Sequence, residues 1–317
     1  GYRSIHPIFI LTFYPGHRGV RIEAVSEIAW LNRLQTVQYS ATLWTGAPGS
    51  EVADYELKDF SHVPKTRWRR DTWSGRPVGK INIDHNLAYM VYSRILPSFD
   101  LSRSVGGSAI DDTLKYYKDR DNFPKLGPDN CSKPGGTCMW YSDFGSSGGR
   151  PELGVLPSWD VRYLYTFDPR LYDVMIANAN VSGHVPIHVR ESSAGKAFHS
   201  GAATPAEANS RVVSIDARSC YVSRFVGEIS CEEDKPVFLT KPSTGIWDPD
   251  LAHQGSFAFV AYLVTGDWYY LEELYFWASW NVAWANQGNC NYCRGGNDDN
   301  PGIYGVVNPW QNIRGIA

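Results

Sequence analysis

Two short segments of this 317-residue chain place tryptophan next to carboxylate, imidazole and amide side chains. Sugar rings have an apolar face and a rim of hydroxyl groups, so an indole ring beside such polar groups suits a saccharide. One carboxylate from each segment would also supply the acid and the base that glycoside hydrolysis requires. The first segment holds Trp159 and Asp160, and the second holds Trp247, Asp248, Asp250, His253 and Gln254.

A second chemistry is indicated by His188 and Arg190, whose side chains would face the same side of a strand. A polysaccharide lyase removes the proton α to a uronate carboxyl, with a histidine as base and an arginine to neutralise the carboxylate. His188 or His253 with Arg190 would fill these roles. Structural alternatives remain open, because His188 and Arg190 could form an ion pair or network, Asp248 and Asp250 could cap a helix, and His253 could be a buried histidine. A metal site would need a third ligand that the sequence does not assign, so we expect no metal or cofactor in catalysis.

Three further motifs favour structural interpretations. Gly145–Gly149 reads Gly-x-Ser-x-Gly around Ser147, but no helix signal follows, so a flexible loop is favoured over a serine esterase. Residues 119–122 and 297–300 offer clustered oxygen atoms to a structural Ca²⁺ without the EF-hand spacing, and a solvated loop is favoured. Tryptophans 277, 280 and 284 recur at helical spacing, which favours core packing over a sugar platform.

The cysteines indicate an oxidising compartment. They occur as three local pairs on loops rich in Gly, Pro and Asn, which favours disulfides and a secreted, extracellular or periplasmic protein. Zinc is the alternative for the last pair, but no second closely spaced pair lies at finger distance. The pairs are Cys131 and Cys138, Cys220 and Cys231, and Cys290 and Cys293.

The type of secondary structure that is predicted to position these residues changes along the chain. Residues 8–14, 20–25 and 36–44 alternate with period two and end at turn signals, which predicts an antiparallel β-sandwich domain over residues 1–105. Residues 88–92 fit a strand or a helix. Residues 106–150 are a Gly-, Asp- and Ser-rich loop region with one short helix predicted over 109–118.

Residues 151–317 contain a repeat, because the segments 162–175 and 261–274 resemble one another. Each has an aromatic-Leu helix end, a Thr-x-Asp turn and a new amphipathic helix. Asp168 and Asp267 stand at the N-cap position, and Pro169 stands at the first helical position. The same αα-hairpin is therefore predicted twice, with extended segments inserted between the two copies, as in a helical repeat or toroid.

Residues 247–254 followed by 261–267, together with 156–160, resemble the hairpins of α/α-toroid carbohydrate-active enzymes, over roughly residues 150–317. These are the six-hairpin glycosidases and the toroidal polysaccharide lyases. The resemblance implies an α+β chain, with a β-sandwich followed by a partial toroid, and a cleft lined by the Trp159 and His253 segments. A complete toroid needs more hairpins than this chain holds, so we expect a smaller architecture or a piece of a longer polypeptide.

The composition narrows the classes of molecule that we expect the protein to bind. The net charge is −3 and no basic block occurs, which argues against nucleic acid and anionic membranes. No run of 18 apolar residues is present, so we expect no membrane span. The expected partner is a polysaccharide or oligosaccharide, and an oligomer stays open. The predicted function is a secreted enzyme that cleaves glycosidic bonds by hydrolysis or β-elimination, and the alternative is a non-catalytic glycan-binding or assembly protein.

Overall fold

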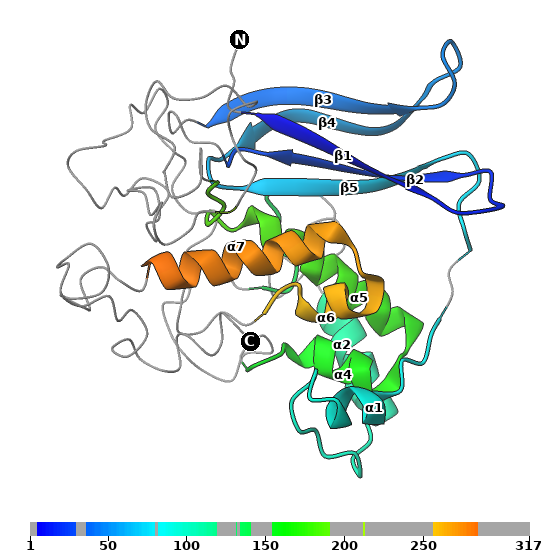
Figure 1. Cartoon of the computed structure of the whole chain (residues 1–317), viewed down its shortest axis with the longest axis vertical. Coiled ribbons are helices and arrows are strands. Elements are labelled where there is room, and N and C mark those ends of the chain that lie inside the picture. The colour runs from blue at the N-terminus through cyan, green and yellow to red at the C-terminus, as the bar shows by residue number, and fades with distance from the viewer. Residues whose placement is uncertain are drawn as a thin grey trace.

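The computed structural model describes residues 5–29, 36–79, 82–118, 131, 134–140, 154–190, 212 and 256–284. These residues form an α+β fold in which antiparallel sheets lie over a layer of helices (Figure 1). The described strands all precede residue 75 and the described helices all follow residue 86, so the predicted α+β class is confirmed. No helix among the described residues is both long enough and apolar enough to cross a bilayer.

The larger sheet has the order β1-β2-β5 and is antiparallel throughout. It is built from β1 (His6–Phe13), β2 (Val20–Glu27) and β5 (Arg67–Ser74). Gly16, at a φ of 76°, lies in the turn between β1 and β2, as the Pro-Gly pair predicts. The register places Ile8 opposite Val25 and Val25 opposite Arg69, so these three side chains share one face of the sheet.

The smaller sheet is an antiparallel hairpin of β3 (Val37–Thr45) and β4 (Val52–His62). It contacts the larger sheet through Tyr39, whose hydroxyl accepts a hydrogen bond from Trp68 Nε1 at 2.8 Å and lies 3.3 Å from Ser26 Oγ. The strands predicted over 8–14, 20–25 and 36–44 correspond to β1, β2 and β3.

The helices follow the strands along the chain. Residues 88–92 are helical rather than extended, because Asn86 Oδ1 accepts a hydrogen bond from the backbone N–H of Tyr89 and so caps the first turn. The predicted helix over 109–118 is also present. The bounds are α1 (Leu87–Tyr92), α2 (Gly107–Lys118), α4 (Ser158–Thr166), α5 (Pro169–Asn180), the 3-10 turn η1 (Val181–His184), α6 (Phe259–Thr265) and α7 (Trp268–Trp284).

The turn between α4 and α5 is built around Thr166. Its hydroxyl donates to the Arg162 carbonyl at 2.8 Å and accepts from the Asp168 backbone N–H at 3.2 Å. Phe167 adopts the left-handed conformation, which ends α4. Asp168 then caps α5 through its bond from the Arg170 N–H, with Pro169 at the first helical position, as the sequence predicts.

The turn between α6 and α7 repeats this pattern of hydrogen bonds. The Thr265 hydroxyl donates to the Ala261 carbonyl at 2.7 Å and accepts from the Asp267 N–H at 3.1 Å. Gly266 takes the left-handed position. The Asp267 carboxylate is bound by Arg21 of β2 at 2.6 and 2.7 Å. The two segments that are similar in sequence therefore form turns with the same chemistry, and the second turn is attached to the sheet.

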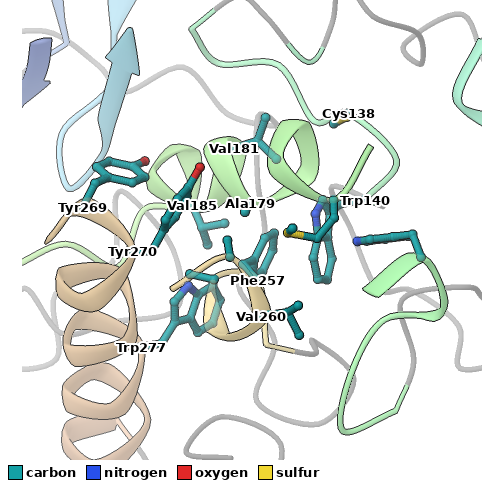
Figure 2. Close-up of a cluster of buried hydrophobic side chains, with 14 of the residues drawn as sticks. Cys138, Trp140, Ala179, Val181, Val185, Phe257, Val260, Tyr269, Tyr270 and Trp277 are labelled. Carbon is teal, nitrogen blue, oxygen red and sulfur yellow. The ribbon is translucent and has the colours of Figure 1, made fainter. Parts of the chain in front are cut away.

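An aromatic core joins the two hairpins (Figure 2). The Phe257 ring stacks on Trp140 and on Trp277, with centroid distances of 3.6 and 5.3 Å. Trp280 is also buried and meets Trp277 edge-on. Core packing of Trp277 and Trp280 is confirmed, whereas the side chain of Trp284 lies outside the described residues.

Candidate functional site

His188 and Arg190 lie together in a buried charged cluster between the larger sheet and α7. Ile187 and Val189 enter the apolar core, so the alternation predicted for an extended segment holds. The backbone N–H groups of His188 and Arg190 donate to Lys65 O and Ala29 O, both at 3.0 Å, which ties this segment to the residues just after β2 and just before β5. Arg190 also forms an isolated antiparallel bridge with Val212.

Arg190 binds two carboxylates. Its Nε and Nη2 donate to the two oxygens of Glu27 at 2.8 and 2.9 Å, which is a bidentate pair. Nη2 also donates to Glu272 Oε1 at 3.0 Å. The second oxygen of Glu272 accepts from Arg67 Nη2 at 2.9 Å, so Glu272 is held between two guanidinium groups.

His188 is fixed through both of its ring nitrogens. Nδ1 lies 2.9 Å from Val185 O and 3.1 Å from Lys65 O, and Nε2 lies 2.9 Å from Glu273 Oε2. Carbonyl oxygens and carboxylates only accept, so each nitrogen must carry a hydrogen unless Glu273 holds the proton. The pair as a whole therefore holds a proton between Nε2 and Oε2, and both side chains have no exposed surface.

The cluster places groups of opposite charge against one another. Glu27 and Glu272 are bound by Arg190, and Glu272 is also bound by Arg67. Glu273 lies against His188. Burial alone would raise the pKa of Glu27, but Arg190 and a hydrogen bond from His6 hold it well below its usual range. Burial also opposes ionisation of Glu273, yet His188 lowers its pKa below the usual value. Neutral pairing of this kind is what allows charges to remain in an interior.

A second ionic group extends the cluster along β2 and β5. Arg69 Nη2 lies 2.8 Å from Glu23 Oε2, and Arg21 contacts Asp71 at 3.1 Å in addition to Asp267. Burial raises the pKa of Glu23 despite the charge of Arg69. Together the two groups connect the inner face of the larger sheet to the first half of α7.

Two further histidines are buried beside the cluster. His62 Nε2 lies 3.1 Å from Thr66 O and its Nδ1 lies 3.0 Å from the Tyr39 hydroxyl. His184 Nδ1 lies 2.7 Å from Gly136 O. Burial lowers the pKa of His62 to about 3 and that of His184 to about 4, so both rings are neutral.

Trp159 and Asp160 lie in the interior, each 1 % exposed, and not on an open cleft. Trp159 meets Trp140 edge-on at 5.0 Å. Neither Asp160 oxygen has a hydrogen-bond partner within the described part of the chain, and burial raises the pKa of this carboxyl well above its usual value. A sugar cannot reach these two side chains in this arrangement, which corrects the expectation that they line a cleft.

Many predicted site residues fall outside the described residues. Cys131 and Cys138 are described and form a disulfide. In the described ranges, no group of three or more His, Cys, Asp or Glu side chains has the arrangement of a metal site. The predicted site residues that lie outside the described ranges are Trp247, Asp248, Asp250, His253, Gln254, Ser147, the two Ca²⁺ candidate loops, and Cys220, Cys231, Cys290 and Cys293.

The partners of His188 and Arg190 were not predicted. Glu27 and Arg67 lie directly opposite each other in the register of β2 and β5 and face the interior. Glu272 and Glu273 interrupt an otherwise apolar stretch of α7. The available signal was the presence of charged residues at positions that the period of a strand or helix assigns to the core.

Comparisons with protein-family models, with curated proteins and with solved structures give no match for this chain.

Proposed function

We propose that the protein is a carbohydrate-active enzyme that cleaves glycosidic bonds, in which a β-sandwich precedes the αα-hairpins of a partial toroid. The observation that supports this proposal most directly is the repeated turn, in which Thr166 and Thr265 make the same two hydrogen bonds. Tandem hairpins with a common turn are the building unit of helical repeats and toroids. The Cys131–Cys138 disulfide supports a location in an oxidising compartment.

In this proposal the buried charged cluster is a structural support. His188 is hydrogen-bonded at both ring nitrogens, and Arg190 is occupied by Glu27 and Glu272. Both therefore act as positioning residues. They fix the chain just before residue 191, and Phe257 fixes it again within the aromatic core.

In this proposal the reacting groups belong to the segment between Arg190 and Phe257, the two residues that fix its ends. Asp248, Asp250 and His253 are the proposed acid and base candidates, and Trp247 and Gln254 are the proposed sugar contacts. This assignment leaves hydrolysis and β-elimination as the two reaction types, because carboxylates serve the first and histidine serves the second.

A panel of neutral and uronate polysaccharides tests the proposal. Hydrolysis releases reducing ends alone, whereas elimination also yields a product with a new, absorbing double bond. Asp250→Asn should abolish the first reaction and His253→Ala the second. Asp112→Asn, on an exposed position of α2, is the matched control and should keep full activity. A panel without any product would refute an enzyme of this class.

The alternative of a non-catalytic glycan-binding protein is favoured by two exposed rings on α7. Trp268 and Tyr275 are seven residues apart and are each about half exposed, while most residues between them are buried. Seven residues advance a helix by about 10.5 Å and return to the same face. The two rings therefore suit two sugars of one glycan strand. Glycan retardation in affinity electrophoresis that is lost in Trp268→Ala and Tyr275→Ala, without any cleavage, would favour this function.

A further inference from the structure

The edge of β1 that faces away from β2 carries a row of exposed apolar side chains. β1 pairs with β2 on one side, and none of the described strands pairs with its other side. Phe9, Leu11 and Phe13 alternate along the strand and are 58, 52 and 69 % exposed. We call these three residues the β1 row. An exposed apolar edge strand is a template for pairing with a further strand.

The hydrogen bonds of the sheet show which residues of β1 direct their backbone groups to this edge. The N–H of Ile28 donates to Thr66 O, so the even-numbered residues of β2 bond towards β5 and the odd-numbered ones towards β1. The partners of these odd-numbered residues in β1 are even-numbered. The N–H and C=O groups of the β1 row therefore lie at the outer edge. Pro7 belongs to the same set, so its missing N–H costs no bond to β2.

The β1 row lies on the face of the larger sheet that also carries the β3–β4 hairpin. The register places Phe9 in line with Ala24 and Arg70, and the guanidinium carbon of Arg70 lies 4.7 Å from the centre of the Tyr55 ring of β4. Figure 1 shows the hairpin on the side of this sheet away from the helices. The hairpin thus covers this face at β5 and leaves it exposed at β1.

β1 lacks the features that keep the hairpin strands from pairing with other chains. β4 exposes Asp54, Glu56 and Lys58, and its pairing with β3 contains two register shifts, and both features oppose edge-to-edge pairing. β1 pairs with β2 over eight residues without a shift, and no charged side chain stands between Pro7 and Phe13. A second copy of this strand would therefore meet it without opposing like charges.

We propose that β1 pairs with β1 of a second copy of the chain, antiparallel about a two-fold axis at Leu11. This register places Phe9 opposite Phe13 of the second copy, and Pro7 opposite Pro15. The new ladder ends at both sides on prolines, which have no N–H to donate, and between them the β1 row meets its own copy. The same patch serves both copies, as a closed two-fold dimer requires.

The area of the β1 row determines how strong this dimer is. A side chain of this size offers roughly 200 Å², so the exposed fractions leave roughly 350 Å² per copy and about 700 Å² for both copies. Stable complexes bury about 1,200 Å² or more. We therefore expect a reversible dimer with a micromolar dissociation constant.

Sedimentation velocity of the full chain, from low micromolar to submillimolar concentration, should show a monomer–dimer equilibrium. Leu11→Lys and Leu11→Glu each oppose two like charges at the two-fold axis and should abolish the dimer. An equal mixture of the two variants opposes unlike charges and should restore it. Thr42→Lys adds a charge at an exposed position of β3 and should leave the equilibrium unchanged.

A wild type that stays monomeric at every concentration would overturn the proposal, and so would a dimer that persists in either Leu11 variant. A mixture that stays monomeric, while both variants keep the wild-type circular dichroism, would overturn the pairing at Leu11. Association beyond the dimer would also overturn it, because a closed two-fold pair leaves no second β1 edge. The dimer does not depend on the proposed function, so cleavage of the polysaccharide panel is a separate result.

Discussion

The buried neutral histidines His62 and His184 should make the protein sensitive to mild acid. Burial lowers the pKa of His62 to about 3 and that of His184 to about 4, whereas an unfolded histidine titrates near 6.5. Between these limits the unfolded chain binds protons that the folded chain does not. Stability is therefore highest above pH 6.5 and is lost as the pH falls towards the folded values.

The size of the effect follows from the width of that window. At pH 5 an unfolded histidine gains about 2 kcal/mol from protonation, and the folded rings gain almost nothing. Two histidines thus reduce the free energy of unfolding by about 4 kcal/mol between pH 7 and pH 5, which is a large share of the total for a typical domain. Glu27 and Glu273, whose pKa values are lowered, lose their contribution only as the pH falls through about 4.5 and below.

Urea unfolding at a series of pH values measures this directly. His62→Gln keeps a donor near the Nε2 position that faces Thr66 O, and His184→Asn keeps one near the Nδ1 position that faces Gly136 O. The double variant should be stable at neutral pH and should lose most of the decline between pH 7 and pH 5. A flat wild-type profile in this range, or the same slope in the double variant, would refute the reasoning.

Three further predictions concern stability. Glu273→Gln leaves an uncompensated buried cation and should lower the free energy of unfolding by about 3–5 kcal/mol in urea, whereas Glu56→Gln on the exposed side of β4 should change it by less than about 1 kcal/mol. Asp160→Leu removes a desolvated carboxyl whose pKa is raised, so it should stabilise the protein at pH 7 and lose this gain below about pH 4, where the unfolded carboxyl is also protonated; destabilisation at pH 7 would contradict it. Replacing Cys131 and Cys138 by serine should lower stability by about 2–3 kcal/mol, and an unchanged melting temperature would contradict this.

Features set by neighbouring residues were predictable from the sequence. The alternation of 8–14 and 20–25 and the intervening Pro-Gly pair were enough for the β1–β2 hairpin. The Thr-x-Asp turns were also predictable, because every hydrogen bond in them joins residues within four positions. The role of Asp267 was not, since its carboxylate is bound by Arg21, 246 residues away.

The candidate site was likewise predictable only where neighbouring residues determine the structure. Placing His188 and Arg190 on one side of an extended segment was correct, because this follows from the period of a strand. Their surroundings depend on Glu27 and α7, which no local pattern connects to them. Asp160 was expected on a cleft because the toroid resemblance implies a cleft lined by the Trp159 segment, but α4 turns it inward next to Trp159 and Leu164. The polarity of a residue therefore did not predict its burial, because elements that are distant in the sequence cover it.

The separation in sequence of the cluster's members also determines when it can form during synthesis. Arg67 meets Glu272 across 205 residues, and Arg190 meets Glu27 across 163. A nascent chain that has only left the ribosome as far as β5 presents Glu27 and Arg67 without α7, so the inner face of its sheet stays hydrated. The strands β1 to β5 are thus made before α7 but are completed only after it, and a fragment that ends before α7 should not mature on its own.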